Sequence, residues 1–203
     1  MKIGMELLFL YRKVLSSFVI CKGVFIMLET DRVIIRRFTI EDAKDMFNNW
    51  TSDKDINKYM LWDLHSTIDD SIKTIEFYIK CYENNSSYIM FAIVDKISNE
   101  VIGSISYNLN RRHDYASIGY LLCKKMQNKG IMTEAINVFT NYLFNELKCN
   151  RIEAEVIKDN IPSIKLLEKC GFKEEGLIRS KYYINNKYND VYVYGKIRDE
   201  KNI

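Results

Sequence analysis

The sequence predicts one α/β domain in which helices pack against a mixed, mostly antiparallel sheet. Apolar residues recur at every third or fourth position over residues 68–83, which is the pattern of an amphipathic helix. Three strand-like runs, 88–95, 101–109 and 115–123, follow one another through short polar links, which favours an antiparallel meander. Helical and strand-like segments then alternate, and that order builds separate layers of helices and sheet.

The first elements have clear local signals. Residues 32–38 are rich in Val and Ile and predict a strand. Thr39, with Asp42 three residues later, predicts a capped helix that continues to Trp50. Residues 52–62 are polar with isolated apolar positions, so we expect them to be irregular.

The middle of the chain supplies two long helices and a strand. Ser66 or Thr67 can cap the helix over 68–83, because either hydroxyl can accept from a free N–H of the first turn. After the meander, the pattern predicts a helix over 133–147 and a strand over 151–157.

The C-terminal part predicts a short helix and a hairpin. Asp159 or Asn160 can cap the helix, and Pro162 falls in its first turn, where no backbone hydrogen bond is lost. Gly171 is the expected stop. The last two strands are expected over 172–183 and 188–197, around a turn at Asn185-Asn186.

Composition excludes several functional classes. The chain has 203 residues, 47% of them hydrophobic, which is enough for the core of one domain. With 30 basic and 27 acidic residues the net charge is only +3, too weak to indicate a nucleic-acid partner. Five scattered cysteines and two histidines form no disulfide or zinc pattern, so we expect no metal and a reducing, cytoplasmic location.

The first 26 residues are treated separately. Charges such as Arg12-Lys13 interrupt their apolar runs, none of which reaches the ~18 residues that span a bilayer. No A-x-A cleavage site follows, so neither a signal peptide nor a membrane anchor is favoured. We expect residues 1–26 to be an extension of uncertain role, either a peripheral helix or an untranslated upstream segment, and the domain to span 27–203 from Met27.

The stretch 127–135 is the most informative part of the chain. It lies between a strand-like run and an amphipathic helix expected to begin near Thr133. Backbone N–H groups at a helix N-terminus are unpaired and the helix dipole is positive there, so anions bind at such junctions. Gly130 lets the backbone approach a ligand closely, because it has no Cβ. A pyrophosphate group would suit this turn.

This stretch resembles the Q/R-x-x-G-x-G/A motif of the GCN5-related N-acetyltransferase (GNAT) superfamily. Gln127 and Gly130 match its first and fourth positions, whereas Met132 replaces the small sixth residue. That change leaves a main-chain cradle intact. The wording Gly-Ile-Met-Thr-Glu-Ala, and a G-x-x-R pattern in the last hairpin, are similar to the ribosomal-protein N-terminal acetyltransferase (RimJ/RimL) branch. Lys187 departs from that branch, in which glycine is common.

A second stretch, 160–172, resembles the GNAT element N-x-x-S/A-x-x-L-Y-E-K-x-G-F. The resemblance implies that Asn160 bonds the pantetheine arm of acetyl-CoA and that the helix lies along the cofactor. The implied cofactor-binding residues are Leu121, Leu122, Gln127, Asn128, Lys129, Gly130, Ile131, Met132, Thr133, Asn160, Ser163 and Lys169.

The resemblance also implies a fold and a mechanism. The GNAT fold has a central sheet of about seven strands flanked by about four helices, and its fourth and fifth strands, here 115–123 and 151–157, splay apart around the pantetheine. Gly119 would suit a bulge at that parting. Acetyl transfer is direct, with backbone N–H groups stabilising the tetrahedral intermediate. Cys123 is therefore expected to be a buried structural thiol.

The chain departs from its relatives at both familiar acid–base positions. Many relatives have a glutamate where this chain has Ser117, and a tyrosine where it has Leu167. Ser117 and Tyr120 remain as candidate catalytic residues. His113 and Asp114 are titratable too, but their loop favours a surface position.

The acceptor site is implied to lie between the last hairpin and the loop after the first helix. Aromatic residues there suit either substrate contact or core anchoring. The candidate substrate residues are Trp50, Tyr59, Trp62 and Asp63.

The leading interpretation is an acetyl-CoA-dependent N-acetyltransferase acting on a protein N-terminal α-amine. An α-amine has a pKa near ~8 and needs less deprotonation than a lysine-type amine near ~10.4, which fits the missing bases. A polyamine or aminoglycoside acceptor, which would demand an acidic pocket, is the alternative. A non-catalytic acyl-CoA-binding protein is a third. The chain is expected to be a monomer or a homodimer.

Overall fold

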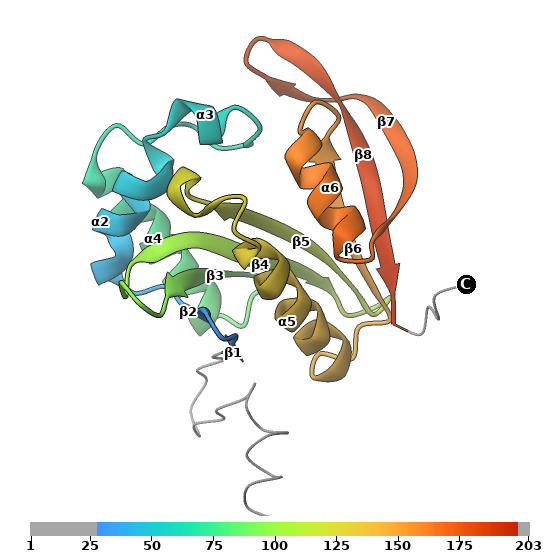
Figure 1. Cartoon of the computed structure of the whole chain (residues 1–203), viewed down its shortest axis with the longest axis horizontal. Coiled ribbons are helices and arrows are strands. Elements are labelled where there is room, and N and C mark those ends of the chain that lie inside the picture. Colours follow the sequence, from blue (N-terminus) through green and yellow to red (C-terminus); the bar gives the residue numbers. More distant parts are fainter. Residues whose placement is uncertain (1–27, 199–203) are drawn as a thin grey trace, which may run out of the picture.

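An eight-stranded sheet forms the centre of the computed structural model, which describes residues 28–198 (Figure 1). Its strand order is β1-β2-β3-β4-β5-β6-β8-β7, antiparallel except between β5 and β6. The strands are β1 (Leu28–Glu29), β2 (Val33–Arg37), β3 (Tyr88–Asp95), β4 (Val101–Asn110), β5 (Tyr115–Leu122), β6 (Arg151–Ile157), β7 (Lys173–Ile184) and β8 (Lys187–Ile197). The extension expected over residues 1–26, and Met27 itself, lie outside the described residues.

Helices cover both faces of this sheet. Figure 1 shows α5 and α6 in front of the sheet, with α2 and α4 behind it. The helices are α2 (Ala43–Met46), α3 (Lys54–Asn57), α4 (Ile68–Glu83), α5 (Ile131–Asn145) and α6 (Ile161–Lys169). Within the described part of the chain, no helix is long and apolar enough to cross a membrane.

The fold class and most of the expected elements are confirmed. The bounds of α4, β3 and β6 match the sequence pattern residue for residue. Thr67, one of the two expected caps, begins α4 in a capping box with Asp70, and Asn160 caps α6 by accepting from the Ser163 N–H at 3.4 Å. In the last hairpin, Asn185 and Asn186 both have positive φ, as a tight type I′ turn requires.

Two small elements raise the counts above the expected seven strands and four helices. β1 pairs only two residues with β2, which is too short for alternation to be visible in the sequence. α3 is a single turn within the segment that was expected to be irregular, and Asp53 caps it by accepting from the Asp55 and Ile56 N–H groups. The expectation of irregular structure over 52–62 was therefore wrong at α3.

The first helix is less regular than its pattern predicts. A 3-10 turn (Ile40–Asp42) leads into α2, and a π-helical turn (Phe47–Thr51) ends the segment. The wide last turn places Trp50 in the sheet-facing core, where only 1% of its surface is exposed.

The core has two parts, one on each face of the sheet. On one face, Ala116 and Ile118 of β5 pack with Phe139 of α5. On the other face, Trp50 packs with Ala92 of β3 and with α4. Successive residues of a strand point to opposite faces, so even-numbered positions of β5 face α5 and odd-numbered positions face away from it.

The parting of β5 from β6 is confirmed. The two strands pair only from Tyr115 to Ser117, opposite Arg151 to Glu153, and then diverge. The β4–β5 register is continuous through Gly119, so the bulge expected there is absent. The register of β4 shifts instead in its pairing with β3, between Ile93 and Val94. The strands part because β6 turns away with β8, and β5 itself stays regular.

His65 ties the segment after α3 to α4 and predicts a pH effect on stability. Its Nδ1 lies 2.7 Å from Ser71 Oγ and its Nε2 lies 3.3 Å from Thr74 Oγ1. Burial lowers the pKa of His65, although Asp70 opposes this. A lowered folded-state pKa means that the unfolded chain binds a proton first as the pH falls through ~6.5. The free energy of unfolding should therefore fall between about pH 7.5 and pH 5.5.

Urea denaturation at the two pH values tests this prediction. His65→Asn should show a smaller fall than the wild type, because its side chain cannot titrate. His113→Asn, which removes the chain's other histidine from an exposed turn, is the matched control. Equal pH dependence in the wild type and His65→Asn would contradict the prediction.

Candidate active site

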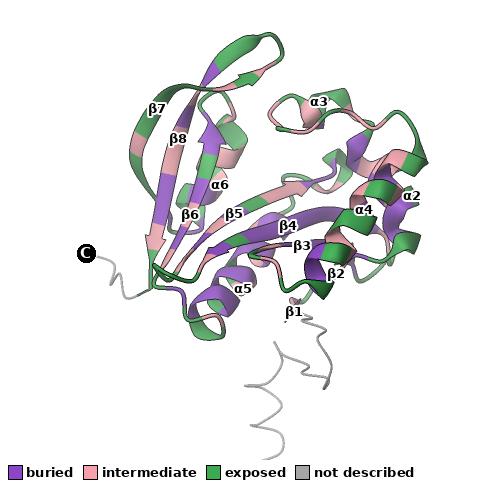
Figure 2. Cartoon of the chain, turned by 180° about the vertical axis from the view of Figure 1, so that it is seen from behind, coloured by how far each residue is buried: buried purple, intermediate pink, exposed green. Residues whose placement is uncertain are grey.

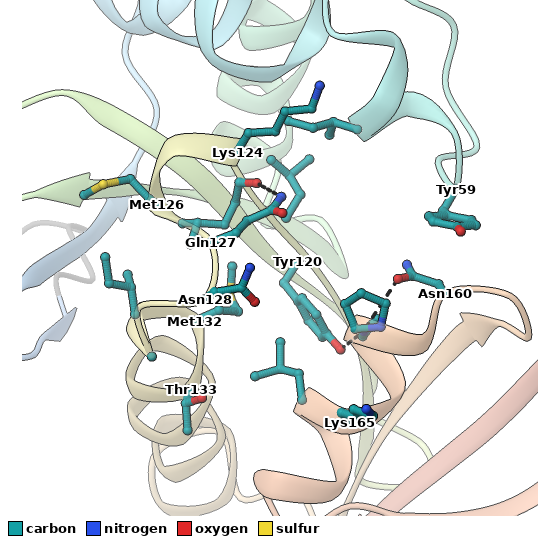
Figure 3. Close-up of a pocket in the computed structure, with 18 of the residues that line it drawn as sticks. Tyr59, Tyr120, Lys124, Met126, Gln127, Asn128, Met132, Thr133, Asn160 and Lys165 are labelled. Atoms are coloured by element: carbon teal, nitrogen blue, oxygen red, sulfur yellow. Dashed lines mark hydrogen bonds between the residues drawn. The ribbon is translucent and has the colours of Figure 1, made fainter.

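A pocket of about 540 Å³ lies beside the end of β5 that β6 has left (Figure 3). Its walls come from α3 and the residues after it, the end of β5 and the turn that follows, the first turn of α5, and one face of α6. This volume is in the range of small-molecule and cofactor sites.

The N-terminus of α5 forms an anion cradle at one side of the pocket. Gly130 has φ 77° and is the N-cap, and the Glu134 N–H is the first to bond back to it, at 3.2 Å. The N–H groups of residues 131–133 therefore have no partner within the helix. Because φ is positive and a Cβ would meet Arg32 Nη2 at 3.4 Å, glycine is strongly preferred here.

Arg32 fixes the cradle from the turn between β1 and β2. Its Nη1 donates to the Lys129 carbonyl at 2.7 Å, and its Nε donates to Glu134 Oε1 at 2.9 Å. The same glutamate accepts from Thr30 Oγ1 at 3.0 Å. The helix begins at Ile131 and ends at Asn145, two residues before each expected bound. It begins earlier than Thr133 because Gly130 is its N-cap.

The free edge of β5 supplies backbone groups to the pocket. Cys123 donates its N–H to the Ile102 carbonyl at 2.8 Å, which sets the alternation of the β4–β5 ladder. That alternation turns the N–H and C=O groups of Tyr120 and Leu122 toward the gap left by β6. Gln127 Nε2 donates to the Leu122 carbonyl at 2.8 Å, as this orientation requires.

Tyr120 brings a hydroxyl into the pocket from β5. Its oxygen lies 2.9 Å from Ser163 Oγ on α6, so the pair joins the two walls (Figure 3). Burial raises the pKa of Tyr120, and the Ser163 hydrogen bond only partly offsets this. The phenol therefore stays protonated at neutral pH and can act as a hydrogen-bond donor.

Lysines make the pocket favourable for an anion. Lys165 and Lys169 lie four residues apart on α6 and both line the pocket. Lys124 lines it from the turn after β5 and makes ion pairs with Asp53 at 2.9 Å and Asp55 at 2.5 Å. These ion pairs also fasten α3 to the end of β5.

Two hydrogen bonds join the segment that follows α3 to the C-terminal half of the chain. Tyr59 donates its hydroxyl to the Asp159 carbonyl at 3.1 Å, and Asn185, at the tip of the last hairpin, donates to the Lys58 carbonyl at 3.0 Å. Figure 1 shows α3 and this hairpin at the same end of the molecule.

The structure brings most of the predicted site residues together. Of the predicted cofactor residues, all but Lys129 line the pocket: Leu121, Leu122, Gln127, Asn128, Gly130, Ile131, Met132, Thr133, Asn160, Ser163 and Lys169. Tyr120 and Tyr59 line it too. Lys129 contributes its carbonyl to Arg32 instead.

The other predicted substrate residues lie elsewhere. Trp50 is in the core, as the alternative of core anchoring expects. Trp62 packs against the same core cluster, 6.0 Å from the His65 ring, and Asp63 is exposed. None of these three lines the pocket.

Three further positions have clear roles in packing or pairing. Leu167 is fully buried, so α6 directs this position into the core and the pocket hydroxyl comes from Tyr120. Cys123 is also buried in the core, and burial raises the pKa of its thiol. Ser117 lies outside the pocket, and its hydroxyl donates to Glu153 Oε1 at 3.0 Å.

Sequence reasoning missed part of the pocket wall. Lys165 could have been found from its spacing to Lys169, whereas the α3 residues carried no signal. The additional lining residues are Asp55, Ile56, Met60, Lys124, Met126, Pro162, Lys165 and Leu166. Among residues 28–198, no group of three or more His, Cys, Asp or Glu side chains could hold a metal ion.

Comparisons with known proteins agree with this geometry. Residues 32–173 match the family model described as "Acetyltransferase (GNAT) domain". The "Uncharacterized N-acetyltransferase p20" of Bacillus licheniformis is 33% identical over 174 residues, which cover 85% of this chain and 97% of that protein.

Two solved structures share the fold. The ribosomal-protein-S5-alanine acetyltransferase of Vibrio fischeri is 27% identical with a TM-score of 0.76, covering 86% of this chain and 97% of that one. The microcin C7 self-immunity acetyltransferase MccE, in complex with acetyl-CoA and AMP, is 26% identical with a TM-score of 0.75, covering 83% and 94%. The chain therefore belongs to the GNAT family of N-acetyltransferases, in agreement with its two motifs.

Proposed function

We propose that this protein uses acetyl-CoA to acetylate a primary amine directly, and that the amine is the α-amine of a protein N-terminus. The observation that carries the proposal is the single pocket in which a glycine-capped helix N-terminus faces the unpaired edge of β5. The first feature suits a diphosphate, and the second suits an extended amide chain that pairs with backbone groups.

The residues present fit acetyl-CoA. The bare backbone at Gly130 leaves room for phosphate oxygens beside the free N–H groups of the first turn of α5. Lys165 and Lys169 add positive charge near the cradle. Apolar side chains such as Met132 and Leu166 line the pocket where a pantetheine arm would lie. The similar protein MccE was solved with acetyl-CoA bound.

Within this proposal, acetyl-CoA supplies the activated acetyl group and the protein supplies position and hydrogen bonds. Backbone N–H groups of Tyr120 and Leu122 face the gap and can hold an acyl oxygen there. The Tyr120 hydroxyl, oriented by Ser163, can donate a proton to a departing thiolate. No covalent bond to the protein is needed, and the buried Cys123 is poorly suited to form one.

A protein α-amine is favoured as acceptor for a chemical reason. The pKa of an α-amine is about one unit above neutral pH, whereas that of a lysine-type amine is more than about three units above it. Each unit costs about 1.4 kcal/mol. Among the residues that line the pocket, the one carboxylate is Asp55, which is already paired with Lys124. The similar V. fischeri protein carries a ribosomal protein in its name.

Thiol release from acetyl-CoA by the full chain tests the proposal. The acceptor panel is a peptide with N-terminal Ser or Ala and an internal Lys, the same peptide with a blocked N-terminus, spermidine, and an aminoglycoside. We expect release with the free peptide and none with the blocked one. Thiol release only with spermidine or the aminoglycoside would show that the acceptor is a small-molecule amine and not a protein N-terminus. Acetyl-CoA binding with no turnover across the panel would favour a binding protein, and no binding would refute the proposal.

Tyr120→Phe is predicted to lower kcat by about 10²-fold, the lower end of the range for a general acid. The reason is the loss of the protonated hydroxyl in the pocket, while the ring still fills its place. The dissociation constant of acetyl-CoA, measured by calorimetry, should change by less than about threefold, because the cradle is untouched. Tyr142→Phe, a buried tyrosine of the same core outside the pocket, is the control. Unchanged kcat in Tyr120→Phe would remove this residue from the mechanism.

A further inference from the structure

The face of β5 that points away from α5 is accessible and polar. Gly119 and Ser117 lie on it, and Gly119 is exposed. In Figure 2, α4 covers the side of β2 and β3, and no described helix lies over β5 and β6 on this face. Ser117 lines a hollow of about 370 Å³ there, together with Asn108, Asn110 and Tyr115. An acceptor can therefore reach β5 from the face opposite α5.

Ser117 and Glu153 meet where β5 and β6 part. They are the last partners of the parallel pairing, and the Ser117 hydroxyl donates to Glu153 Oε1 at 3.0 Å. A hydroxyl that donates its hydrogen keeps two lone pairs free to accept. The Ser117 oxygen can thus accept a hydrogen bond from the N–H of an ammonium group that lies over the backbone of Gly119. Gly119 is two residues further along β5, on the same face as Ser117.

The carboxylate of Glu153 is held by the Ser117 hydroxyl and by a long ion pair with Arg151. Arg151 Nε reaches its Oε2 at 3.4 Å, while both terminal nitrogens of the same guanidinium bond Glu175. The Arg151 guanidinium therefore pairs chiefly with Glu175, through both of its terminal nitrogens. Glu155, two residues along the same face, accepts from Tyr182 and Lys181 and is already occupied. The charged or titratable side chains that share this face or line the hollow are Arg111, Tyr115, Arg151, Glu155, Lys173 and Glu175.

We propose that Glu153 is the proton acceptor for the amine substrate and that the Ser117 hydroxyl relays the proton. This inference rests on the proposed acetyl transfer. The proposed base, Glu153, is on β6. It is hydrogen-bonded to Ser117, which occupies the β5 position where relatives carry a glutamate. Ser117 touches the amine, and Glu153 acts through it.

The protons and bonds balance without a further reactant. The ammonium gives one proton to Ser117 Oγ as the hydroxyl proton passes to Glu153, which later releases it to water. The neutral nitrogen then forms the N–C bond as the C–S bond breaks. The second proton leaves the nitrogen and ends on the thiol.

The pH profile of kcat/KM for Glu153→Gln tests the relay. In the wild type, the reacting pair is the carboxylate and the ammonium, so kcat/KM should be flat from about pH 6 to about pH 8 with an N-terminal Ser or Ala peptide. In Glu153→Gln, only the neutral amine can react. Its kcat/KM should be about 10²-fold lower at pH 6 and rise about tenfold per pH unit toward the pKa of the amine. The dissociation constant of acetyl-CoA should not change.

A rescue and a control separate this role from a structural one. Ser117→Glu combined with Glu153→Gln returns a carboxylate to the same place and should restore the flat profile. Glu155→Gln, on the same strand and face, should keep the wild-type profile. A flat profile in Glu153→Gln, or rates within about threefold of wild type, would overturn the relay while leaving acetyl transfer intact. Absence of turnover in the wild type would instead remove the proposed function, and the relay with it.

Discussion

Replacing Gly130 with glutamate is expected to lower the affinity for acetyl-CoA by at least about a hundredfold. The substitution puts a carboxylate beside the free N–H groups that begin α5, where the phosphates would bind. Two like charges about 5 Å apart repel by about 3 kcal/mol at an effective dielectric constant of about 20, and every 1.4 kcal/mol is a factor of ten. The substitution also strains the backbone, because φ at this residue is 77°, which is unfavourable for a residue with a Cβ.

Gly171→Glu separates charge in the cradle from backbone strain. Gly171 has φ 79°, ends α6, and does not line the pocket, and the nearest atom to an added Cβ is 3.7 Å away. The two variants should lose similar amounts of stability in urea, roughly 1–2 kcal/mol, because each forces a side chain into the left-handed region. Only Gly130→Glu should lose acetyl-CoA binding in calorimetry. Equal affinity in both variants would show that the cradle does not bind the phosphates.

The parts of the fold that the sequence predicted are those whose signal is local and periodic. α4 shows its buried face at helical spacing, β3 is a short apolar run, and β6 begins with alternating charged and apolar residues, so their bounds agree with the pattern. β1 and α3 contain only a few residues and have no period to detect. The first helix has a helical pattern, but the π-helical turn that buries Trp50 depends on packing against the sheet.

The site divides in the same way. Gly130 and Asn160 were predictable because a cap and a helix N-terminus are encoded in adjacent residues. The pairing of Ser117 with Glu153 was not, since it depends on the register of two parallel strands whose partners are 36 residues apart. Leu167 is a similar case: its place in a motif did not reveal that α6 turns it into the core. Tertiary register decides which of these side chains meet.

Replacing Phe139 with alanine is expected to reduce the free energy of unfolding by about 3–5 kcal/mol, the range for deleting a large buried aromatic side chain. Phe139 is fully buried at the centre of α5. Its ring meets those of Phe91, Tyr107 and Tyr142 at centroid distances of 5.7, 6.2 and 6.3 Å. Urea denaturation of the full chain measures the loss. Phe77→Ala is the matched control and should cost less than about 1 kcal/mol, since Phe77 is 55% exposed on α4.

Phe139→Ala also tests how far the cradle depends on the core beneath it. Phe139 follows the start of α5 by about 12 Å of helix, at 1.5 Å per residue. Because Arg32 fixes the start of α5 independently, through Lys129 and Glu134, the folded variant should keep its cradle. Acetyl-CoA at about a hundred times its dissociation constant should then raise the stability of wild type and variant by the same ~2.7 kcal/mol. A smaller gain in the variant would mean that packing around Phe139, and not the Arg32 contacts alone, holds the helix N-terminus in its binding geometry.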